Sequence, residues 1–461
     1  MNDNREIFEQ QVTLPVSVEE AFAWHERPGA LQRLMPPWEY VKILRQQGGI
    51  ADGALVEVQI KLGLLRLRWL SEHYGYDPPH RFCDRQVKGP FALWEHTHLF
   101  EPAADAGGCV LRDHFEYRLP GGWLGRLLGG RMVQKKLRRM FTYRHVTTLH
   151  DLAAHARYGR QGSMKIAITG ASGLVGSELC ALLTTAGHQV TRLVRHRPEA
   201  GEVYWNVKDQ EIDAAGLEGH DAVVHLAGEN IASSRWSPAQ KKRIRNSRVD
   251  GTRLLSDALA KLQNKPQVFI CASATGYYPV DTGEELTEDS PPGDTFLAEI
   301  CREWEAAAAP AIAAGIRVVY PRFGVVLSPR GGALAKMLTP FRLGVGGVIG
   351  SGRQVMSWIA LDDAIGAIYH ALNQPELRGP VNVVAPQAVT NREFTKTLGR
   401  VLGRPTILPV PAFAIRLALG EMADELLLSG MHVVPKRLLE TGYTFRFPDL
   451  ESALRHMLGR P

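Results

Sequence analysis

Hydrophobic and polar positions follow one pattern before about residue 160 and a different one after it. In the first part, short runs rich in β-branched and aromatic residues are separated by Gly, Pro and Asp. Runs of this kind predict the strands of an antiparallel sheet. The predicted strands span residues 6–14, 55–62, 65–74, 81–87, 92–101 and 109–118.

Two helices are predicted around these strands. Ser17 is followed three residues later by Glu20, the spacing of a capping box at the start of a helix. A longer helical pattern covers about residues 122–156. The order of strand, helix, antiparallel strands and long closing helix resembles the helix-grip fold of the START-like polyketide cyclase/dehydrase superfamily.

The resemblance implies an apolar ligand cavity between a curved sheet and the closing helix. Trp69, Trp94 and Phe115 lie on the predicted strands and are candidates to line it. In the alternative interpretation, which we favour, these three side chains are ordinary core residues. Nothing in this part of the sequence suggests a catalytic cluster.

The predicted closing helix carries many cations among apolar residues. A basic amphipathic helix can lie on a membrane surface. We favour a simpler interpretation, in which the apolar face covers the sheet and the basic face meets water. The cations are Arg126, Arg131, Lys135, Lys136, Arg138 and Arg139, and the apolar residues are Leu127, Leu128, Met132, Leu137 and Met140.

After residue 164, apolar segments alternate with helical patterns. Strands are predicted at residues 165–169, 188–194, 222–226 and 268–272, and helices at 177–185 and 240–259. This alternation predicts a Rossmann-type α/β fold, in which a parallel sheet is covered by helices.

A polar, glycine-bearing segment separates the two patterns. We predict a helix-grip domain over residues 1–155, a linker over 156–163, and a second unit over 164–461. Within the second unit we expect a nucleotide-binding core over about 164–330 and smaller substrate-side elements over about 331–461. Two domains suit a chain of 461 residues.

Composition and charge narrow the class of protein. Hydrophobic residues make up 45% of the chain and the formal net charge is +6, with no nucleic-acid-binding motif. The five cysteines are scattered, as is typical of a reducing compartment. The sequence has no signal-peptide core at its start and no run of 18 apolar residues. We therefore expect a cytoplasmic protein without an integral membrane segment and without a nucleic-acid partner.

A glycine-rich turn follows the strand at residues 165–169 and precedes a helix, which is the setting of a dinucleotide-binding fingerprint. Gly170 permits the tight turn, Gly173 lets the backbone approach a pyrophosphate, and Gly176 lets the helix pack close to the strand. The residues predicted to contact the cofactor here are Gly170, Ala171, Ser172, Gly173, Leu174, Val175 and Gly176.

The second strand of this unit indicates which cofactor is bound. NAD-binding sheets place an acidic residue at its end, where it holds the ribose 2′-hydroxyl. Here Val194 is followed by Arg195, His196 and Arg197. Arginine pairs well with a 2′-phosphate, so we predict NADP(H) rather than NAD, with Arg195 as a ligand. The alternative is a solvated basic turn, which leaves NAD unfavoured.

The next strands end in further candidates. The strand that ends at Leu226 is followed by small residues, Ala227 and Gly228, which would let the dinucleotide cross the edge of the sheet, so all three are predicted cofactor contacts. Ser273 emerges where chemistry usually occurs in such sheets, and it is a further predicted cofactor contact. The motif order includes T-G-A-S-G-L-V-G, H-L-A-G, S-A-T-G-Y-Y, P-R-F-G-V-V-L-S-P and W-I-A-L-D-D, together with G-E-N-I and G-S-G-x-Q. From Met164 onward the chain resembles the extended short-chain dehydrogenase/reductase superfamily, in its NAD-dependent epimerase/dehydratase branch. The finer match is to the sugar-nucleotide epimerase-like oxidoreductase group.

The resemblance implies a catalytic set of Asn, Ser, Tyr and Lys, from which this chain departs. Aligned on Glu305, the tyrosine position holds Leu297 and the lysine position holds Cys301. The asparagine position holds Arg248, and only Ser273 remains. We expect Arg248 to pair with a cofactor phosphate or the nicotinamide ribose.

These observations lead to a functional prediction with two alternatives. We expect an NADP(H)-binding oxidoreductase or epimerase-like enzyme that acts on a small molecule, and that forms a homodimer as relatives often do. Ser273 and Tyr278 are the candidate catalytic residues, with Tyr277, Glu299, Cys301 or Glu303 as further possibilities. One alternative is a non-catalytic NADP(H) sensor or scaffold coupled to a domain that binds hydrophobic ligands. The other is a hydrophobe carrier with a regulatory reductase-like half.

Overall fold

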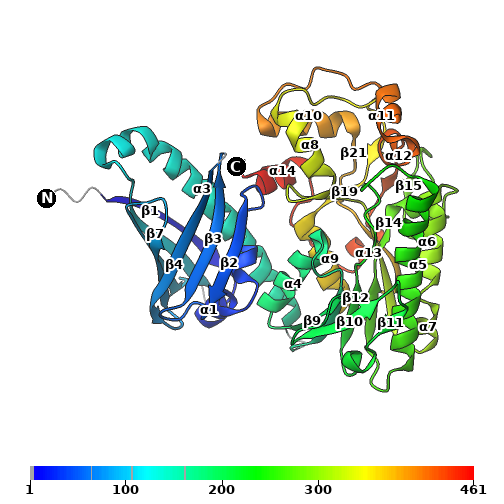
Figure 1. Cartoon of the computed structure of the whole chain (residues 1–461), viewed down its shortest axis with the longest axis horizontal. Helices are drawn as coiled ribbons and strands as arrows, with labels where there is room; N and C mark the ends of the chain where they lie inside the picture. Colours follow the sequence, from blue (N-terminus) through cyan, green and yellow to red (C-terminus); the bar gives the residue numbers. More distant parts are fainter. Residues whose placement is uncertain (1–4, 64, 105–106, 160–161, 461) are drawn as a thin grey trace. The chain divides into compact units, whose positions relative to one another are not determined.

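A computed structural model describes residues 5–63, 65–104, 107–159 and 162–460. The chain forms two compact units. The first consists of Met1–Arg160 with Thr184–Gly187 and His456–Pro461, and the second of Gln161–Leu183 and His188–Arg455. Figure 1 shows both, coloured along the sequence.

The first unit is built on a seven-stranded antiparallel sheet with the strand order β1-β7-β6-β5-β4-β3-β2. Six of the strands lie where the alternating pattern predicts them. The sequence did not predict β2, because its seven residues are all exposed or half-buried and show no apolar alternation. The strands are β1 (Glu6–Leu14), β2 (Val41–Gln47), β3 (Leu55–Leu62), β4 (Leu65–Asp77), β5 (Arg81–Lys88), β6 (Leu93–Pro102) and β7 (Cys109–Arg118).

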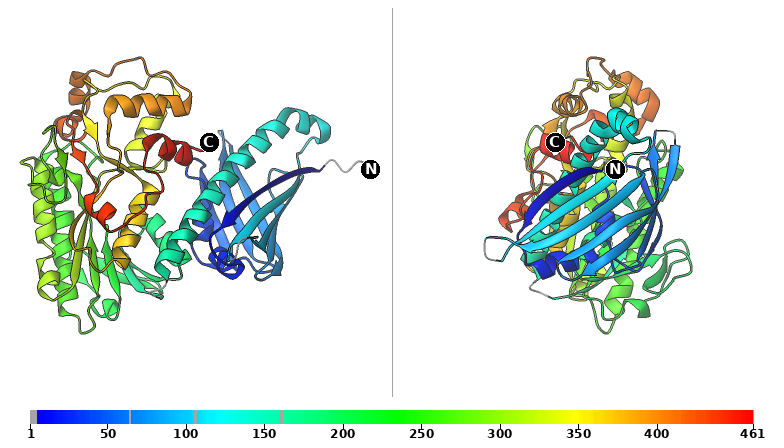
Figure 2. Two further views of the ribbon diagram at one scale, coloured as in Figure 1. Left: turned by 180° about the vertical axis from the view of Figure 1, so that it is seen from behind. Right: turned by 90° about the vertical axis from the view of Figure 1, so that its left-hand side faces the viewer.

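Three helices accompany this sheet, namely α1 (Val18–Glu26), α2 (Ala30–Arg33) and α3 (Gly122–Tyr158). The side chain of Ser17 accepts a hydrogen bond from the backbone N–H of Glu20 and so caps α1 as predicted. The long helix α3 runs across one face of the strands (Figure 2). The prediction of a helix-grip fold is therefore confirmed.

The three aromatic residues considered for a ligand cavity pack within the core. Trp94 and Phe115 are buried, and Trp69 is half-buried. The ring centroids of Trp69 and Trp94 are 4.9 Å apart, and those of Trp94 and Phe115 are 5.1 Å apart. This packing matches the alternative interpretation, in which the three rings are core.

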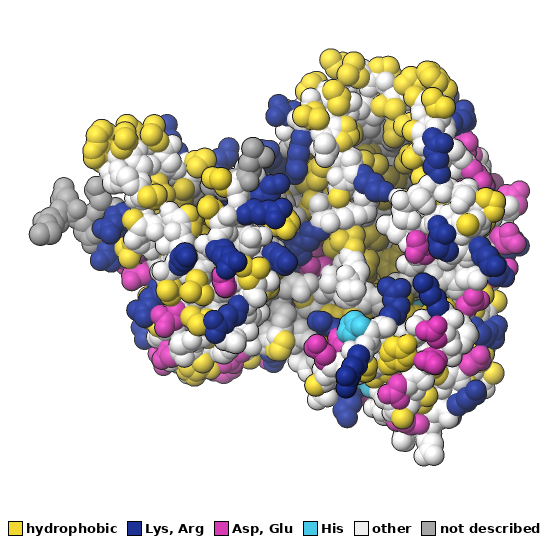
Figure 3. Space-filling view, viewed as in Figure 1, with side chains coloured by type: hydrophobic (Ala, Val, Ile, Leu, Met, Phe, Trp, Pro, Cys, Tyr) yellow, Lys and Arg dark blue, Asp and Glu magenta, His cyan; other side chains and the backbone are white. Residues whose placement is uncertain are grey.

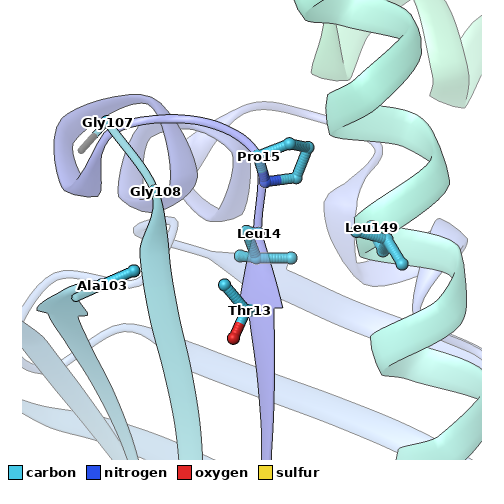
Figure 4. Close-up of a pocket in the computed structure, with 7 residues that line it drawn as sticks. All are labelled: Thr13, Leu14, Pro15, Ala103, Gly107, Gly108 and Leu149. Carbon is cyan, nitrogen blue, oxygen red and sulfur yellow. The ribbon is translucent and has the colours of Figure 1, made fainter. Parts of the chain in front are cut away.

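A small pocket lies elsewhere in the first unit, where β1 ends and β7 begins (Figure 4). None of the described residues that line it carries a charge. Its lining residues are Thr13, Leu14, Pro15, Ala103, Gly107, Gly108 and Leu149.

The helix α3 divides into two parts by exposure. Leu137 and Phe141 are buried against the sheet. Leu127 and Leu128, nearer the start of the helix, are 72% and 78% exposed. The expectation that the apolar face covers the sheet thus holds for the second part of α3 and is wrong for the first. No helix among the described residues is both long and apolar enough to cross a membrane.

The second unit contains a nine-stranded, mainly parallel sheet. Its order is β11-β10-β9-β8-β12-β13-β16-β14, and β20 pairs with β16. The first strand along the chain, β8, lies in the middle, with β9 and β10 on one side and β12, β13 and β16 on the other. The strands are β8 (Lys165–Thr169), β9 (Gln189–Val194), β10 (Glu202–Asn206), β11 (Glu211–Ile212), β12 (Ala222–His225), β13 (Val268–Cys271), β14 (Ser273–Ala274), β16 (Arg317–Phe323) and β20 (Gly379–Val383).

This strand order is that of a doubly wound Rossmann-type sheet, as predicted. On one face of the sheet, helices bury apolar residues of the strands, including Ala167, Val223 and Phe269. The helix α5 starts at Pro238 because Ser237 caps it, accepting a hydrogen bond from the N–H of Gln240. The main helices of this half are α4 (Leu174–Thr185), α5 (Pro238–Lys261), α6 (Phe296–Ala306), α7 (Ala309–Ala313) and α9 (Leu361–Asn373).

A smaller part built largely from the C-terminal residues completes the second unit (Figure 1). It contains α8 (Gly332–Arg342), α10 (Asn391–Leu402), α11 (Ala412–Leu419), α12 (Glu421–Ala423), a π-helical turn (Asp424–Leu428) and α13 (Lys436–Glu440). Short strand pairs link it to the larger part, namely β15 (Glu285–Leu286) with β22 (His432–Val433), β17 (Val325–Leu327) with β19 (Trp358–Ala360), and β18 (Val355–Met356) with β21 (Val389–Thr390).

Candidate functional site

The glycine turn lies at the carboxyl end of β8 and fits closely against the end of β12. Gly170 has a φ of 69°, and a Cβ there would lie 2.9 Å from the backbone of Leu226 and Ala227. A Cβ on Gly176 would lie 2.2 Å from the carbonyl oxygen of Gly170. Both positions therefore require glycine, because any larger residue would push the turn away from β12 or α4 away from the turn.

A buried hydrogen-bond cluster joins the same two strand ends. The hydroxyl oxygen of Thr169 accepts hydrogen bonds from the N–H groups of Leu226 and Ala227, at 3.1 and 3.2 Å. It lies 2.6 Å from Nδ1 of His225, to which it donates its proton. Burial lowers the pKa of His225 to about 3, so the ring is neutral and its tautomer is set by Thr169. The cluster holds the backbone of Leu226 and Ala227 beside the turn.

The turn and helix α4 have the features of a pyrophosphate site. Ser172 and Gly173 are exposed, and α4 begins directly after them at Leu174. The first N–H groups of a helix have no partner within the helix, and they attract anions together with the helix dipole. The glycine cradle and this helix start therefore fit a dinucleotide.

Exposed cations lie at the carboxyl end of β9. Arg195, His196 and Arg197 follow this strand directly, and all three are exposed. Because β9 pairs in parallel with β8, these residues lie at the same edge of the sheet as the glycine turn. Within the described part of the chain, neither Arg195 nor Arg197 makes an ion pair with a carboxylate.

Arg248 of α5 lies over the end of β12. Its Nη1 donates to the carbonyl oxygens of Glu229 and Ile244, at 3.0 and 3.1 Å. The guanidinium lies 5.0 Å from the ring centroid of Trp304, and a Cβ on Gly228 would lie 3.4 Å from its Cζ. Burial lowers the pKa of this group, which is still a cation because arginine starts from a very high value. Arg248 thus brings a positive charge to the predicted cofactor residues at 226–228.

Ser273 belongs to a buried ionic network. Its hydroxyl donates to Oε1 of Glu305 at 2.7 Å. Arg322 binds the same carboxylate with two donors, each at 2.8 Å. Serine, glutamate and arginine come from β14, α6 and β16, so three elements are tied together at one point. Arg322 lies in the P-R-F-G motif and Glu305 is the residue on which the catalytic positions were aligned, but the sequence did not indicate that they pair.

Tyr278 is engaged in the same network. Its hydroxyl accepts from Nη1 of Arg322 at 2.9 Å and donates to Oδ1 of Asn382 at 2.7 Å. The side chain has no exposed surface, and burial raises its pKa to about 12. These contacts count against Tyr278 as a proton donor. Tyr277 is half-buried, and its ring lies 3.5 Å from the Cζ of Arg322.

The two positions that would hold tyrosine and lysine are apolar or neutral. Leu297 packs near Gly276 and joins an apolar cluster with Trp236, Ile300 and Met422. Cys301 is 3% exposed, and burial raises the pKa of its thiol to about 12. Neither residue supplies the acid and fixed cation of the usual pair.

The surface of the second unit is hollowed between its sheet and its smaller part, and hydrophobic side chains are visible in the hollow (Figure 3). The arrangement offers a dinucleotide cradle, several cations and a hollow with hydrophobic side chains. Tyr278, Leu297 and Cys301 do not offer an evident proton donor.

Comparisons with known proteins agree with this architecture. Residues 166–384 match the NAD dependent epimerase/dehydratase family. Residues 14–142 match the family of polyketide cyclase/dehydrase and lipid transport proteins. Residues 410–457 match a domain of unknown function.

Individual relatives cover the second unit almost completely. An epimerase family protein of Mycobacterium bovis is 46% identical over 297 residues, which is 64% of this chain and 98% of that protein. The human epimerase family protein SDR39U1 is 40% identical and is covered over its whole length, against 64% of this chain.

Two solved structures are informative. A nucleoside-diphosphate sugar epimerase from Corynebacterium glutamicum is 34% identical with a TM-score of 0.81, covering 98% of this chain and 90% of its own. Human SDR39U1, solved with NADPH, is 38% identical with a TM-score of 0.60, covering 64% of this chain and 99% of its own. The chain therefore belongs to the NAD-dependent epimerase/dehydratase family of short-chain dehydrogenase/reductase proteins, as an NAD(P)-binding member with a polyketide cyclase-type domain at its N-terminus.

Proposed function

We propose that this chain binds NADP(H) in preference to NAD(H) and exchanges a hydride between it and a small-molecule substrate. The observation that carries the proposal is the pair of exposed arginines, Arg195 and Arg197, at the end of β9. At this position a carboxylate would repel a 2′-phosphate, whereas a guanidinium binds it with two hydrogen bonds. The NADPH in the structure of human SDR39U1 supports the same choice.

Different residues of the chain would bind different parts of this cofactor. The turn from Gly170 to Gly176 and the start of α4 would bind the pyrophosphate, with Arg195 on the 2′-phosphate. Arg248 would meet a phosphate or the nicotinamide ribose, beside the backbone of residues 226–228. When bound, NADP(H) supplies or accepts the hydride.

Ser273 is the residue that we expect to contact the substrate. Its hydroxyl donates a hydrogen bond to the carboxylate of Glu305, and Arg322 fixes the position of that carboxylate. The lone pairs of the serine oxygen are then available to accept a hydrogen bond from a substrate hydroxyl. Ser273 would position the substrate by accepting a hydrogen bond from the alcohol, and when a carbonyl is reduced to that alcohol the proton that accompanies the hydride would come from water.

A non-catalytic NADP(H) sensor is the second candidate. Leu297 and Cys301 favour it, because neither can replace the tyrosine and lysine of the usual mechanism. The two candidates differ in turnover but agree in cofactor preference.

Affinity measurements with the full chain test the cofactor assignment. Arg195→Ala removes a charged hydrogen-bond donor, so NADPH affinity should fall by about 10- to 100-fold while NADH affinity changes little. Arg404→Ala, at an exposed arginine after α10, is the matched control and should leave both unchanged. Equal loss of both cofactors, or no loss at all, would contradict the assignment.

Turnover measurements separate the two candidates. NADPH oxidation would be followed with a panel of small carbonyl compounds, and Ser273→Ala would be compared with the wild-type chain. A rate that Ser273→Ala lowers by tenfold or more supports the enzyme. Tight NADPH binding without turnover in any member of the panel supports the sensor.

A further inference from the structure

Four titratable side chains of the first unit converge on one face of its sheet. Asp84 of β5 lies opposite His96 of β6, and His98 lies opposite Asp113 of β7. His96 and His98 are two residues apart on one strand, so both side chains point to the same face. The register of three strands therefore gathers two carboxylates and two imidazoles that are far apart in the sequence.

Three of these side chains present ligand atoms to a common point. Nδ1 of His96 lies 2.9 Å from Oδ2 of Asp84, and Nε2 of His98 lies 4.0 Å from the same oxygen. All three atoms lie within 4.8 Å of one another. Ligand atoms around a tetrahedral zinc ion are separated by about 3.3 Å, so shifts on the order of 1 Å would complete such a site.

Asp113 contacts, on both imidazoles, the nitrogen that faces away from Asp84. Its Oδ1 lies 2.9 Å from Nε2 of His96 and 2.8 Å from Nδ1 of His98. Its Oδ2 lies 2.6 Å from Nε2 of His145 on α3. A carboxylate behind a histidine is the usual support of a metal-binding imidazole, because it leaves the near nitrogen free for the ion.

The imidazole of His98 lacks a hydrogen bond at one of its two nitrogens, Nε2. The ring is 7% exposed, and its Nδ1 lies 2.8 Å from Oδ1 of Asp113, the oxygen that also contacts His96. Its Nε2 is too far from Asp84 to form a hydrogen bond. Within the described residues, Nε2 of this buried imidazole therefore has no hydrogen-bond partner, which is rare unless something else binds the ring.

Aromatic side chains fix both rings in place. Phe82 stacks on His98 with a centroid separation of 4.1 Å, and Phe115 stacks on His96 at 3.7 Å. The side chain of Asp84 is 18% exposed, which gives an ion a route from solvent to the group. Ring positions set in advance lower the cost of assembling a metal site.

We propose that Asp84, His96 and His98 bind a divalent transition-metal ion, with Asp113 as the supporting carboxylate. Two imidazole nitrogens and one carboxylate oxygen form the ligand set of a zinc ion that keeps a fourth position open. The two carboxylates balance the charge of the ion in the presence of the cation Arg144 on α3. Three further histidines near the cluster, His25 on α1, His73 on β4 and His145 on α3, lie outside the ligand set.

The test uses the full chain, produced without a histidine tag and stripped with a chelator. Zn²⁺ would be titrated by calorimetry, and Co²⁺ would be added as a spectroscopic probe of coordination. We expect one ion per chain and a visible cobalt spectrum of a four- or five-coordinate nitrogen and oxygen site. Asp84→Asn and His98→Gln should each weaken binding at least about tenfold, and Asp113→Asn by about 10- to 100-fold.

His114→Gln is the matched control, since His114 lies on β7 next to Asp113, on the opposite face of the strand, and is 30% exposed. It should leave Zn²⁺ binding unchanged. NADPH affinity and far-ultraviolet circular dichroism would verify that each variant is folded. The proposal is overturned if the folded wild-type chain binds no Zn²⁺, if Asp84→Asn and His98→Gln bind it like wild type, or if cobalt shows an oxygen-only spectrum.

The start of α3 carries a second, independent feature. Five large apolar side chains are each at least 48% exposed there, and at 3.6 residues per turn they cover about half of the helix circumference, which we call the apolar stripe. They are Trp123, Leu124, Leu127, Leu128 and Met132. Exposed apolar stripes of this size indicate a surface that another body covers.

The charges around this stripe indicate what covers it. Arg131, Lys135 and Arg138 are exposed, and none makes an ion pair within the described residues. No acidic residue occurs between Glu116 and Asp151. We infer that the start of α3 docks on an anionic phospholipid surface, with the stripe in the interface and the cations at the headgroups.

Vesicle sedimentation tests this surface. The full chain should bind vesicles of equal parts phosphatidylglycerol and phosphatidylcholine and should release them at high salt. Leu127→Ser with Leu128→Ser should weaken binding at least about tenfold. Ile407→Ser, at a side chain that is 79% exposed in the second unit, should have no effect.

Two outcomes would overturn the inference. One is equal vesicle binding by the wild-type chain and the double-serine variant, or no binding by either. The other is a wild-type oligomer that the double-serine variant converts to monomers, because the stripe would then be an interface between copies of this chain.

Discussion

Each unit of this chain buries a carboxylate among several partners, but the partners differ in kind. In the second unit, Glu305 is bound by the guanidinium of Arg322, with two hydrogen bonds of 2.8 Å. In the first unit, Asp113 is surrounded by the imidazoles of His96, His98 and His145. The first arrangement is a permanent ion pair, and the second can change its charge.

The difference follows from the chemistry of the partners. Guanidinium keeps its proton at any physiological pH, so Glu305 always has a counter-charge. An imidazole near neutral pH can be charged, neutral or bound to a metal. A fixed pair suits a scaffold that positions Ser273, whereas exchangeable partners suit a site that takes up an ion.

The largest expected effect comes from breaking the permanent pair. Arg322→Met leaves Glu305 buried without its cation, so the free energy of unfolding should fall by about 3–5 kcal/mol. Denaturant unfolding of the full chain, monitored with a probe of the second unit, measures this loss. The double variant with Glu305→Gln should recover part of it, and a loss below about 1 kcal/mol would show that the pair is not a true anchor.

A third buried carboxylate, that of Asp363, extends the comparison to the pH dependence of the free energy of unfolding. Asp363 accepts hydrogen bonds from the N–H groups of Arg446 and Phe447 and from the hydroxyl of Tyr443. Burial raises the pKa of Asp363 to about 6, above the value of about 3.9 in an unfolded chain. The folded state therefore holds this proton more tightly than the unfolded state.

The sign of the pH effect follows. As the pH rises from about 4 to about 6, the free energy of unfolding should fall by about 3 kcal/mol from this group and then level off. Asp363→Asn should remove that part of the dependence, as measured by denaturant unfolding at a series of pH values. The same slope in the variant and in wild type would contradict the assignment.

The smallest loss of stability is expected from a change at Tyr278, which contacts the permanent ion pair through Arg322. Tyr278→Phe removes one hydrogen bond to Asn382 and one from Arg322, at a cost of about 1–2 kcal/mol. If turnover of NADPH is found, its rate should change by no more than a few fold. A loss of 100-fold or more would instead identify Tyr278 as the proton donor.

Local sequence patterns predicted the nucleotide-binding half well. Gly170 and Gly176 stand in one strand–turn–helix segment, so their close packing follows from a few neighbouring residues. The end of β12 was predicted for the same reason. The clamp formed by Thr169 and His225 was not, because it depends on which two strands lie side by side.

The buried networks were not predictable because register decides them. His96 and His98 stand on one predicted strand, but only the pairing with β5 and β7 brings Asp84 and Asp113 to them. The pairing of Glu305 with Arg322 likewise needs the packing of α6 against β16. The exposed stripe on α3 was misjudged because the sequence does not say where the sheet beneath the helix ends.

The outer strand β2 has a consequence for how the first unit behaves at high concentration. An edge strand offers unpaired N–H and C=O groups to any other extended chain, and this is a common route to aggregation. Two cations, Lys42 and Arg45, lie exposed on β2, and its pairing with β3 shifts between Ile43 and Arg45. The charges and the irregular register together hinder a neighbouring molecule from adding a strand at this edge of the sheet.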